Sequence, residues 1–269
     1  MLAVVDIGNT NIVLGLFVGD ALVAQFRLAT RAATPADEYA ALIDATLRLS
    51  NHSFFSIKGM CLASVVPDLV PVFEDIGHRY IKSPVLTVTA ETPTGIQVDY
   101  HPPSDVGPDR ILNAVAGHHR HADNLVIVDF GTATTLDAVT ADGRYVGGVI
   151  VPGIAMGLDV LARRTARLPR VAPGRPMRVI GQTTRDSICS GGFWGHIATI
   201  EGLITRIQGE LPGPARVLAT GGLAQVLAPD CKAIDEVLPN LTLEGLKLVW
   251  DLNHPSESQG GGSDSGAIS

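Results

Sequence analysis

The sequence predicts an α/β protein of two duplicated halves, each with a mixed β-sheet flanked by helices, and with a cleft between the halves. Two observations predict this fold class: a strand-and-turn unit occurs twice, and helical patterns follow each copy. The first copy is the apolar run 2–5, which leads into DIGNT at 6–10. The second is the apolar run 125–128, which leads into DFGT at 129–132, nearly half of the chain later.

A tight turn follows each copy. A Gly-Asp pair at 19–20 and an Asp-Gly pair at 142–143 each stand between two apolar runs. This pattern predicts a β-hairpin. Each half therefore opens with a strand, a D-x-G turn, a second strand, a tight turn and a third strand. A chance resemblance between two common D-x-G turns is the alternative.

Helical spacing comes later in each half. Thr34-Pro35 predicts a helix start with threonine as the N-cap and proline at the first helical position. Tyr39, Leu42, Ile43 and Leu47 then fall on one face of this helix.

A polar segment, GHHRHADN at 117–124, separates the two copies. We place the N-terminal half at 1–118 and the C-terminal half at 119–255. The last segment, 256–269, consists mainly of small polar residues and glycine, with nothing to bury. It is predicted to be a disordered tail.

The composition favours a cytoplasmic protein over a nucleic-acid-binding or membrane protein. The chain has 269 residues, 46% of them hydrophobic, and a net charge of -7. A sizeable core can form, and there is no basic excess for DNA binding. The N-terminus lacks the basic segment of a signal peptide, and no apolar run is long enough for a membrane span. The three scattered cysteines, without a CxxC pair, suit a reducing cytoplasm better than a disulfide framework.

The two D-x-G turns suit phosphate binding. Asp6, at the end of a buried strand, points into the cleft and is placed to hold Mg²⁺ through water. Gly8 lets the backbone approach a ligand, so that the N–H groups of residues 8–10 face phosphate oxygens. Thr132, in the second turn, is expected to face the first turn across the cleft.

A third segment completes the pattern, and other nucleotide motifs are missing. The strand 217–220 leads into Gly221-Gly222, which fits the close approach of a flat ligand such as adenosine, with an ordinary strand-to-helix turn as the alternative. There is no GxxxxGK[ST] loop and no GxGxxG after the first strand. The DFG at 129–131 lies in a strand-to-hairpin turn without an upstream HRD, which argues against a protein kinase.

Asp109 is the candidate catalytic base. Gly107-Pro108-Asp109-Arg110 precedes the helical run 111–115, and proline suits a first helical turn. The helix dipole favours an ionised Asp109 at neutral pH, which suits a group that accepts a proton from a primary hydroxyl. Arg110 can form a fork on a carboxylate. From the residues alone, a capping aspartate beside a surface arginine is the alternative.

Taken in order, these blocks resemble the actin-like ATPase (ribonuclease H-like) fold and, more closely, the type III pantothenate kinase family. Further blocks of the resemblance are SVVP at 64–67, GG at 147–148 with PG at 152–153, and IG at 180–181 with Thr184. The resemblance covers nearly the whole chain up to Asp251. It implies ATP-dependent phosphorylation of pantothenate to 4′-phosphopantothenate, the first step of coenzyme A biosynthesis, with Mg²⁺ and K⁺ or NH₄⁺, in a homodimer.

The resemblance also implies roles for individual residues. Asp109 is the base, and Asp129 is the ligand of the monovalent cation, although the residues alone do not distinguish potassium from magnesium there. The expected ATP contacts are Asp6, Ile7, Gly8, Asn9, Thr10, Asn11, Ile12, Val13, Thr132, Gly221 and Gly222. The expected pantothenate contacts are Tyr100, Gly107, Pro108, Asp109, Arg110 and Thr184, the last of them presented across the dimer. The chain departs from the family at Pro102, where related sequences carry asparagine, and this stiffens the backbone after Tyr100.

The segment 185–207 predicts a long helix with small residues at three- and four-residue spacing. The members of this stripe are Ser187, Gly191, Gly195, Ala198 and Gly202. Such a stripe lets another helix approach closely. We expect it at a dimer interface, with packing inside one chain as the alternative.

Three other functions stay open at this point: a sugar kinase of the same fold, a non-enzymatic nucleotide switch and a transcription regulator. The lack of a zinc-binding cysteine cluster argues against the first, the lack of room for inserted subdomains against the second, and the acidic charge against the third. His118, His119 and His121 have no cysteine partners, and we expect them at the end of a surface helix rather than at a metal.

Overall fold

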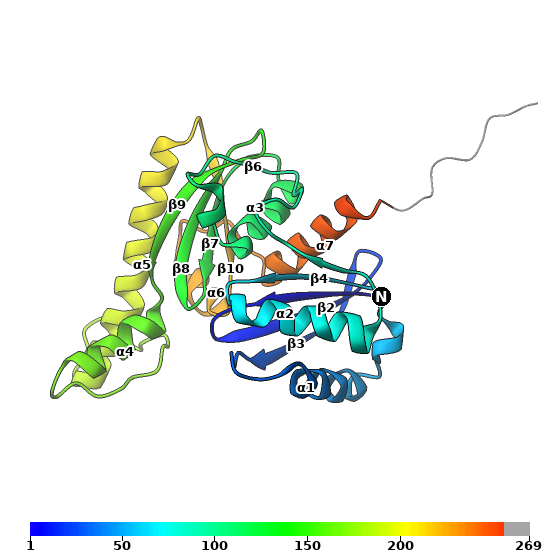
Figure 1. Cartoon of the computed structure of the whole chain (residues 1–269). Coiled ribbons are helices and arrows are strands. Elements are labelled where there is room, and N and C mark those ends of the chain that lie inside the picture. Colours follow the sequence, from blue (N-terminus) through cyan, green and yellow to red (C-terminus); the bar gives the residue numbers. More distant parts are fainter. Residues whose placement is uncertain (256–269) are drawn as a thin grey trace, which may run out of the picture.

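The computed structural model describes residues 1–255, and the tail predicted at 256–269 lies outside the described residues. Over residues 1–255, eleven strands form two sheets, and helices cover and separate them (Figure 1). The first sheet contains β1 (Leu2–Ile7), β2 (Asn11–Val18), β3 (Ala21–Ala29), β4 (Gly59–Ser64) and β5 (Val85–Thr87). The second contains β6 (Gln97–Val98), β7 (Asn124–Phe130), β8 (Ala133–Val139), β9 (Arg144–Pro152), β10 (Ala215–Thr220) and β11 (Glu236–Val237). The α-helices are α1 (Ala36–Leu49), α2 (Val70–Ile76), α3 (Pro108–Arg120), α4 (Ile154–Arg164), α5 (Thr184–Glu210), α6 (Ala224–Leu227) and α7 (Leu241–Asn253).

The two sheets repeat one topology. The first has the strand order β3-β2-β1-β4-β5, and the second has β9-β8-β7-β10-β11, with β6 added beside β9. In each sheet the first three strands pair antiparallel, and the fourth pairs in parallel with the first. Asp6 and Asp129 both occupy the next-to-last position of the first strand. The predicted duplication of an α/β unit with mixed sheets is therefore confirmed.

Both predicted hairpin turns are present. Gly19 joins β2 to β3 with φ +56°, and Gly143 joins β8 to β9 with φ +81°. These are left-handed conformations, which glycine adopts without a steric cost. The expected start of the first helix was wrong by one position, because α1 begins at Ala36 and Pro35 is its N-cap.

Three apolar cores hold the layers together. One lies between the first sheet and the helices α1 and α2, and another between the second sheet and α4, α5 and α6. The third surrounds α3 and α7, which lie between the two sheets (Figure 1). Because helices cover both faces of β1 and β7, these strands read as continuous apolar runs rather than as alternating ones.

The two halves exchange elements. Strand β6 joins the second sheet, while α7 packs against α3, β1 and β4. A side chain at Gly245 of α7 would lie 2.2 Å from the carbonyl oxygen of Leu112 in α3, so this close helix packing requires glycine. The division that we expect after residue 118 falls in the last turn of α3. No helix within residues 1–255 is long and apolar enough to cross a membrane.

Candidate active site

The two D-x-G turns meet in space. The Oγ1 atoms of Thr10 and Thr132 lie within hydrogen-bonding distance at 2.9 Å, and both residues are exposed. The first turn joins β1 to β2 and the second joins β7 to β8, so each sheet contributes the loop that follows its central strand. The sequence placed Thr132 opposite the first turn, and the structure brings the two together.

The first turn offers two backbone donors rather than three. The N–H of Gly8 donates to the carbonyl oxygen of Asn11 at 3.0 Å and is not free for phosphate, contrary to expectation. Asn9 and Thr10 are exposed, and their N–H groups form no hydrogen bond within residues 1–255. Ile7 and Ile12 are buried in the core beneath α1, so that only their backbone is near the turn.

Three aspartates form an acidic cluster beside these turns. Asp6 and Asp129 are the next-to-last residues of β1 and β7, and Asp109 lies in the first turn of α3. All three residues are half-buried. Burial, with the charges of Asp109 and Asp129, raises the pKa of Asp6 to about 8. Burial, with the charge of Asp109, raises the pKa of Asp129 to about 7.

Asp109 follows the same trend. Burial raises its pKa, and the backbone N–H of Arg110, which donates to Oδ1 at 3.0 Å, opposes the rise. The sequence predicted its place in the first helical turn correctly, but the helix terminus does not lower the pKa of Asp109 overall because burial outweighs it. A side chain at Gly107, the N-cap, would lie 2.5 Å from Asp109 Oδ1, so glycine leaves room for the carboxylate.

The donor set of the cluster fits magnesium. Mg²⁺ prefers carboxylate and hydroxyl oxygens and keeps several of its waters. Within residues 1–255 no three His, Cys, Asp or Glu side chains converge on one point to form a metal site. An ion beside Asp6 would therefore take its remaining ligands from water and from phosphate oxygens.

Buried neighbours hold Asp129 in place. Asn113 Nδ2 donates to Asp129 Oδ2 at 3.2 Å, and the hydroxyl of Thr242 donates to Asn113 Oδ1 at 2.8 Å. Gly221 has φ +92°, and a side chain there would lie 2.3 Å from Asp129 Oδ1. Gly221 thus makes room for Asp129, and Gly222 next to it is exposed. Sequence reasoning missed Asn113, although an asparagine inside an apolar helical run was a signal.

Arg110 forms a buried ion pair and is not a surface arginine. Its Nε donates to Asp137 Oδ1 at 2.8 Å, and its Nη2 lies 2.6 Å from the same oxygen. Asp137 also accepts from the hydroxyl of Tyr145 at 2.7 Å and from Thr135 Oγ1 at 3.0 Å. A side chain at Gly148 would lie 2.8 Å from Arg110 Nη2, so glycine makes room for the pair. Asp137 and Tyr145 were missed, and the signal was a lone aspartate in an apolar strand.

The charges of this pair depend on each other. Burial lowers the pKa of Arg110, but the charge and hydrogen bond of Asp137 outweigh it and raise the pKa overall. Burial raises the pKa of Asp137, and Arg110, Tyr145 and Thr135 oppose that rise. With a guanidinium and two hydroxyls donating to it, Asp137 is an ionised partner of Arg110.

The predicted acceptor residues come together only in part. Tyr100 is half-buried, and its ring centroid lies 6.5 Å from that of Tyr145. The guanidinium of Arg110 also lies over the ring of Tyr145. Thr184 is exposed and is the first residue of α5. The N-terminal end of α5 lies beside α4 (Figure 1). Within residues 1–255, Thr184 forms no hydrogen bond with the other predicted site residues.

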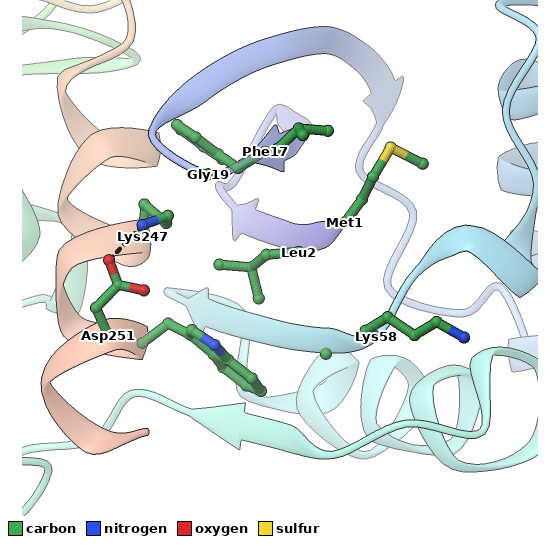
Figure 2. Close-up of a pocket in the computed structure, with 10 residues that line it drawn as sticks. Met1, Leu2, Phe17, Gly19, Lys58, Lys247 and Asp251 are labelled. Atoms are coloured by element: carbon green, nitrogen blue, oxygen red, sulfur yellow. Dashed lines mark hydrogen bonds and ion pairs between the residues drawn. The ribbon is translucent and has the colours of Figure 1, made fainter. Parts of the chain in front are cut away.

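Two cavities flank the first sheet. A cavity of about 690 Å³ adjoins Pro108 and Ile111 on α3, and no charged side chain lines it. A smaller one of about 330 Å³, shown in Figure 2, is lined by Leu2, Lys247 and Asp251 among others. Leu2 begins β1 and Asp6 lies near its end, so this cavity is roughly 13 Å along the strand from the acidic cluster. It is not part of the site.

The predicted histidines form no metal site. His118 and His119 lie in the last turn of α3, and Nε2 of His121, just after it, lies 2.8 Å from a carboxylate oxygen of Glu236. Within the described residues they belong to no cluster that could hold a metal.

The duplicated sheets, the paired turns and the acidic cluster between them define a phosphotransferase of the actin-like ATPase fold. A sequence model of the family described as type III pantothenate kinase matches residues 2–206, and the chain belongs to this family. It is 41% identical over 256 residues to the type III pantothenate kinase of Geotalea daltonii, covering 95% of this chain and 100% of the relative. It is 42% identical over 253 residues to that of Geobacter sulfurreducens, covering 94% and 99%.

Solved structures confirm the fold. A conserved Baf family protein from Campylobacter jejuni, named as a transcriptional activator, superimposes with a TM-score of 0.60 at 20% identity, over 93% of this chain and 98% of that one. The inorganic polyphosphate/ATP-glucomannokinase of an Arthrobacter species does so with a TM-score of 0.50 at 14% identity, over 94% and 99%. These likenesses show the fold alone.

Proposed function

We propose that the protein transfers the γ-phosphoryl group of ATP to the primary hydroxyl of pantothenate, giving ADP and 4′-phosphopantothenate, in the first step of coenzyme A biosynthesis. One observation carries this proposal: Asp109 lies in an acidic cluster beside two phosphate-type turns, in a chain of the pantothenate kinase family. Asp109 takes the proton of the hydroxyl as its oxygen attacks phosphorus. Its raised pKa makes it a better proton acceptor than an exposed aspartate.

The ATP phosphates occupy the space at the two turns. The free N–H groups of Asn9 and Thr10 and the hydroxyls of Thr10 and Thr132 donate to phosphate oxygens. Asp6 would hold Mg²⁺ through water, which would supply charge neutralisation at the phosphates. The exposed Gly222 lies next to the adenosine. Asp129 binds the monovalent cation, K⁺ or NH₄⁺.

We place the carboxylate of pantothenate at Arg110, beside Tyr100. Arg110, in the first turn of α3, carries guanidinium N–H donors that suit a carboxylate, whereas the large cavity next to α3 has no charged side chain in its lining. Arg110 follows Asp109 directly, so the first turn of α3 supplies contacts to both the hydroxyl and the carboxylate of the acceptor.

A homodimer formed through α5 accounts for the small-residue stripe on this helix and for Thr184. Most of the small-residue stripe is exposed, and a side chain added at Gly191 or Gly195 would meet nothing within 4 Å. Apolar side chains before α5 are also exposed, with Met177 at 101% and Ile180 at 82% of their free surface. Thr184 of each subunit then reaches the acceptor of the other. The three free cysteines suit a reducing cytoplasm, where we place the enzyme.

The test is ADP release from ATP and Mg²⁺, with and without pantothenate, in potassium and in sodium buffer. We expect turnover to require pantothenate and to be faster in potassium. The variant Asp109→Asn should lose about 10²–10⁴-fold in kcat, as expected for a lost general base, with ATP affinity retained. Hydrolysis that ignores pantothenate would contradict the proposal and favour a nucleotide switch.

A further inference from the structure

We infer that Asp137 is a positioning residue for the acceptor: it fixes the guanidinium of Arg110 so that one donor, Nη1, is presented to the acceptor carboxylate. The inference rests on the proposed contact between Arg110 and that carboxylate. It adds a residue that lies 27 positions away in the sequence, on β8, and that does not itself touch the acceptor.

The geometry leaves Arg110 one orientation. Its Nε and Nη2 both engage Asp137 Oδ1, at 2.8 and 2.6 Å, which fixes the plane of the guanidinium. The side chains are 8% exposed for Arg110 and 0% for Asp137. Asp137 is also held from its other sides, because Tyr145 donates to Oδ1 and Thr135 to Oδ2. The carboxylate therefore cannot turn toward another donor.

The remaining nitrogen is open. Within residues 1–255, Nη1 of Arg110 forms no hydrogen bond, and it does not belong to the side-chain atoms that are both buried and without a partner. Nη1 is therefore neither hydrogen-bonded nor completely shielded from solvent. The ring centroid of Tyr145 lies 5.7 Å from the guanidinium carbon of Arg110, and the ring centroid of Tyr100 lies 6.5 Å from that of Tyr145. An anion at Nη1 thus meets a donor whose guanidinium is held by Asp137 and lies over the ring of Tyr145.

This arrangement makes recognition directional. Asp137 balances the charge of Arg110, so the pair attracts an anion by a placed hydrogen bond more than by net charge. The preference for a carboxylate over a neutral group at the same place should then depend on Asp137 as much as on Arg110.

The experiment compares kcat/KM for pantothenate with that for panthenol, in which a hydroxymethyl group replaces the carboxylate. We expect Asp137→Asn to lower the preference for pantothenate about tenfold, mainly through its KM, because a charge-assisted hydrogen bond is lost or misplaced. Tyr145→Phe, which removes one bond to Asp137 and keeps the ring, should lower it roughly two- to fivefold. Tyr145→Phe also tests the inference if Asp137→Asn does not fold. The double variant Arg110→Gln/Asp137→Asn should match Arg110→Gln alone.

The controls separate the possible failures. If Arg110→Gln keeps the wild-type preference, the proposed contact is wrong and the inference falls with it. If Arg110→Gln loses the preference but Asp137→Asn and Tyr145→Phe lower both acceptors equally, the contact stands and Asp137 is only structural. Ile43→Val, in the outer core of the first half, should leave the preference unchanged. A changed preference there would mean that it follows stability, which would also overturn the inference.

Discussion

The hydroxyl oxygens of Thr10 and Thr132 lie 2.9 Å apart, although 122 positions separate the two residues in the chain. Each belongs to the turn after the central strand of its own sheet. The contact is one place at which the duplicated units meet, and both residues are exposed there. A ligand that binds between the turns is therefore held by both halves.

Replacing either threonine should weaken ATP binding. We expect Thr10→Val and Thr132→Val each to raise the KM for ATP about five- to tenfold, because each removes a hydrogen-bond donor worth about 1 kcal/mol. The KM for pantothenate at saturating ATP should change little. A double-mutant cycle should show coupling, since the two hydroxyls share one ligand and one contact. Thr46→Val, on the exposed face of α1, is the control. Variants that behave like this control would show that the turns do not bind ATP jointly.

The acidic cluster makes stability depend on pH. Burial and the neighbouring carboxylates raise the pKa of Asp6 to about 8 and that of Asp129 to about 7, from 3.8. The folded protein thus binds these protons more tightly than the unfolded chain. Their stabilisation is fully present below pH about 4 and is lost as the pH rises through 7 and 8.

Thermal unfolding without ligands checks this sign. From pH 6 to 9, the melting temperature of the wild type should fall by several degrees more than that of Asp6→Asn, which has one fewer proton to lose. Mg²⁺ with a non-hydrolysable ATP analogue should restore the wild type at pH 9. Equal slopes for the two proteins would contradict the raised pKa of Asp6.

Asn113 should set the pH range of activity. Its hydrogen bond to Asp129 lowers the pKa of that carboxyl, against the effect of burial. In Asn113→Leu this opposition is lost, the pKa of Asp129 rises further, and the acid limb of the pH–rate profile should shift to higher pH. The hydroxyl of Thr242 also loses its acceptor, which costs about 1–3 kcal/mol of stability.

Thr242→Val separates the two effects. It removes the outer bond and keeps the one between Asn113 and Asp129, so it should lower stability with a much smaller shift of the profile. An unchanged acid limb in Asn113→Leu would show that the ionisation of Asp129 does not limit the rate.

Local patterns predict much of this fold, because its central strands and turns are local features. Strands β1 and β7 are predicted by the apolar runs before Asp6 and Asp129. The two hairpin turns are predicted by the glycines at 19 and 143, each from a few neighbouring residues. Position 109 in the first turn of α3 followed from the proline before it. The shared topology of the two sheets then follows from the repeat.

Long-range partners could not be read in this way. Asp137 and Asn113 are single polar residues in apolar segments, and their meaning depends on Arg110 and Asp129, which lie 27 and 16 positions away. The packing of α7 against β1 joins opposite ends of the chain. Burial in three dimensions also decided the pKa of Asp109, where the helix dipole alone pointed in the other direction.

The stripe on α5 gives the last prediction. Gly195 is exposed, and a side chain there would meet nothing within 4 Å in its own chain. Gly195→Arg should therefore fold as well as the wild type, with a gain of about 0.5–1 kcal/mol in helix propensity. In a homodimer that packs α5 against its copy, the arginine should instead separate the subunits.

Light scattering at micromolar concentration measures the outcome. We expect a dimer for the wild type and a monomer for Gly195→Arg. The melting temperature of the variant should fall only by the amount that the loss of the dimer interface explains. Because Thr184 is proposed to act on the acceptor of the other subunit, the KM for pantothenate should rise more than that for ATP. Gly209→Arg, also exposed on α5 but outside the stripe, should stay dimeric and active. A wild type that is monomeric at this concentration would remove both the dimer and the shared role of Thr184.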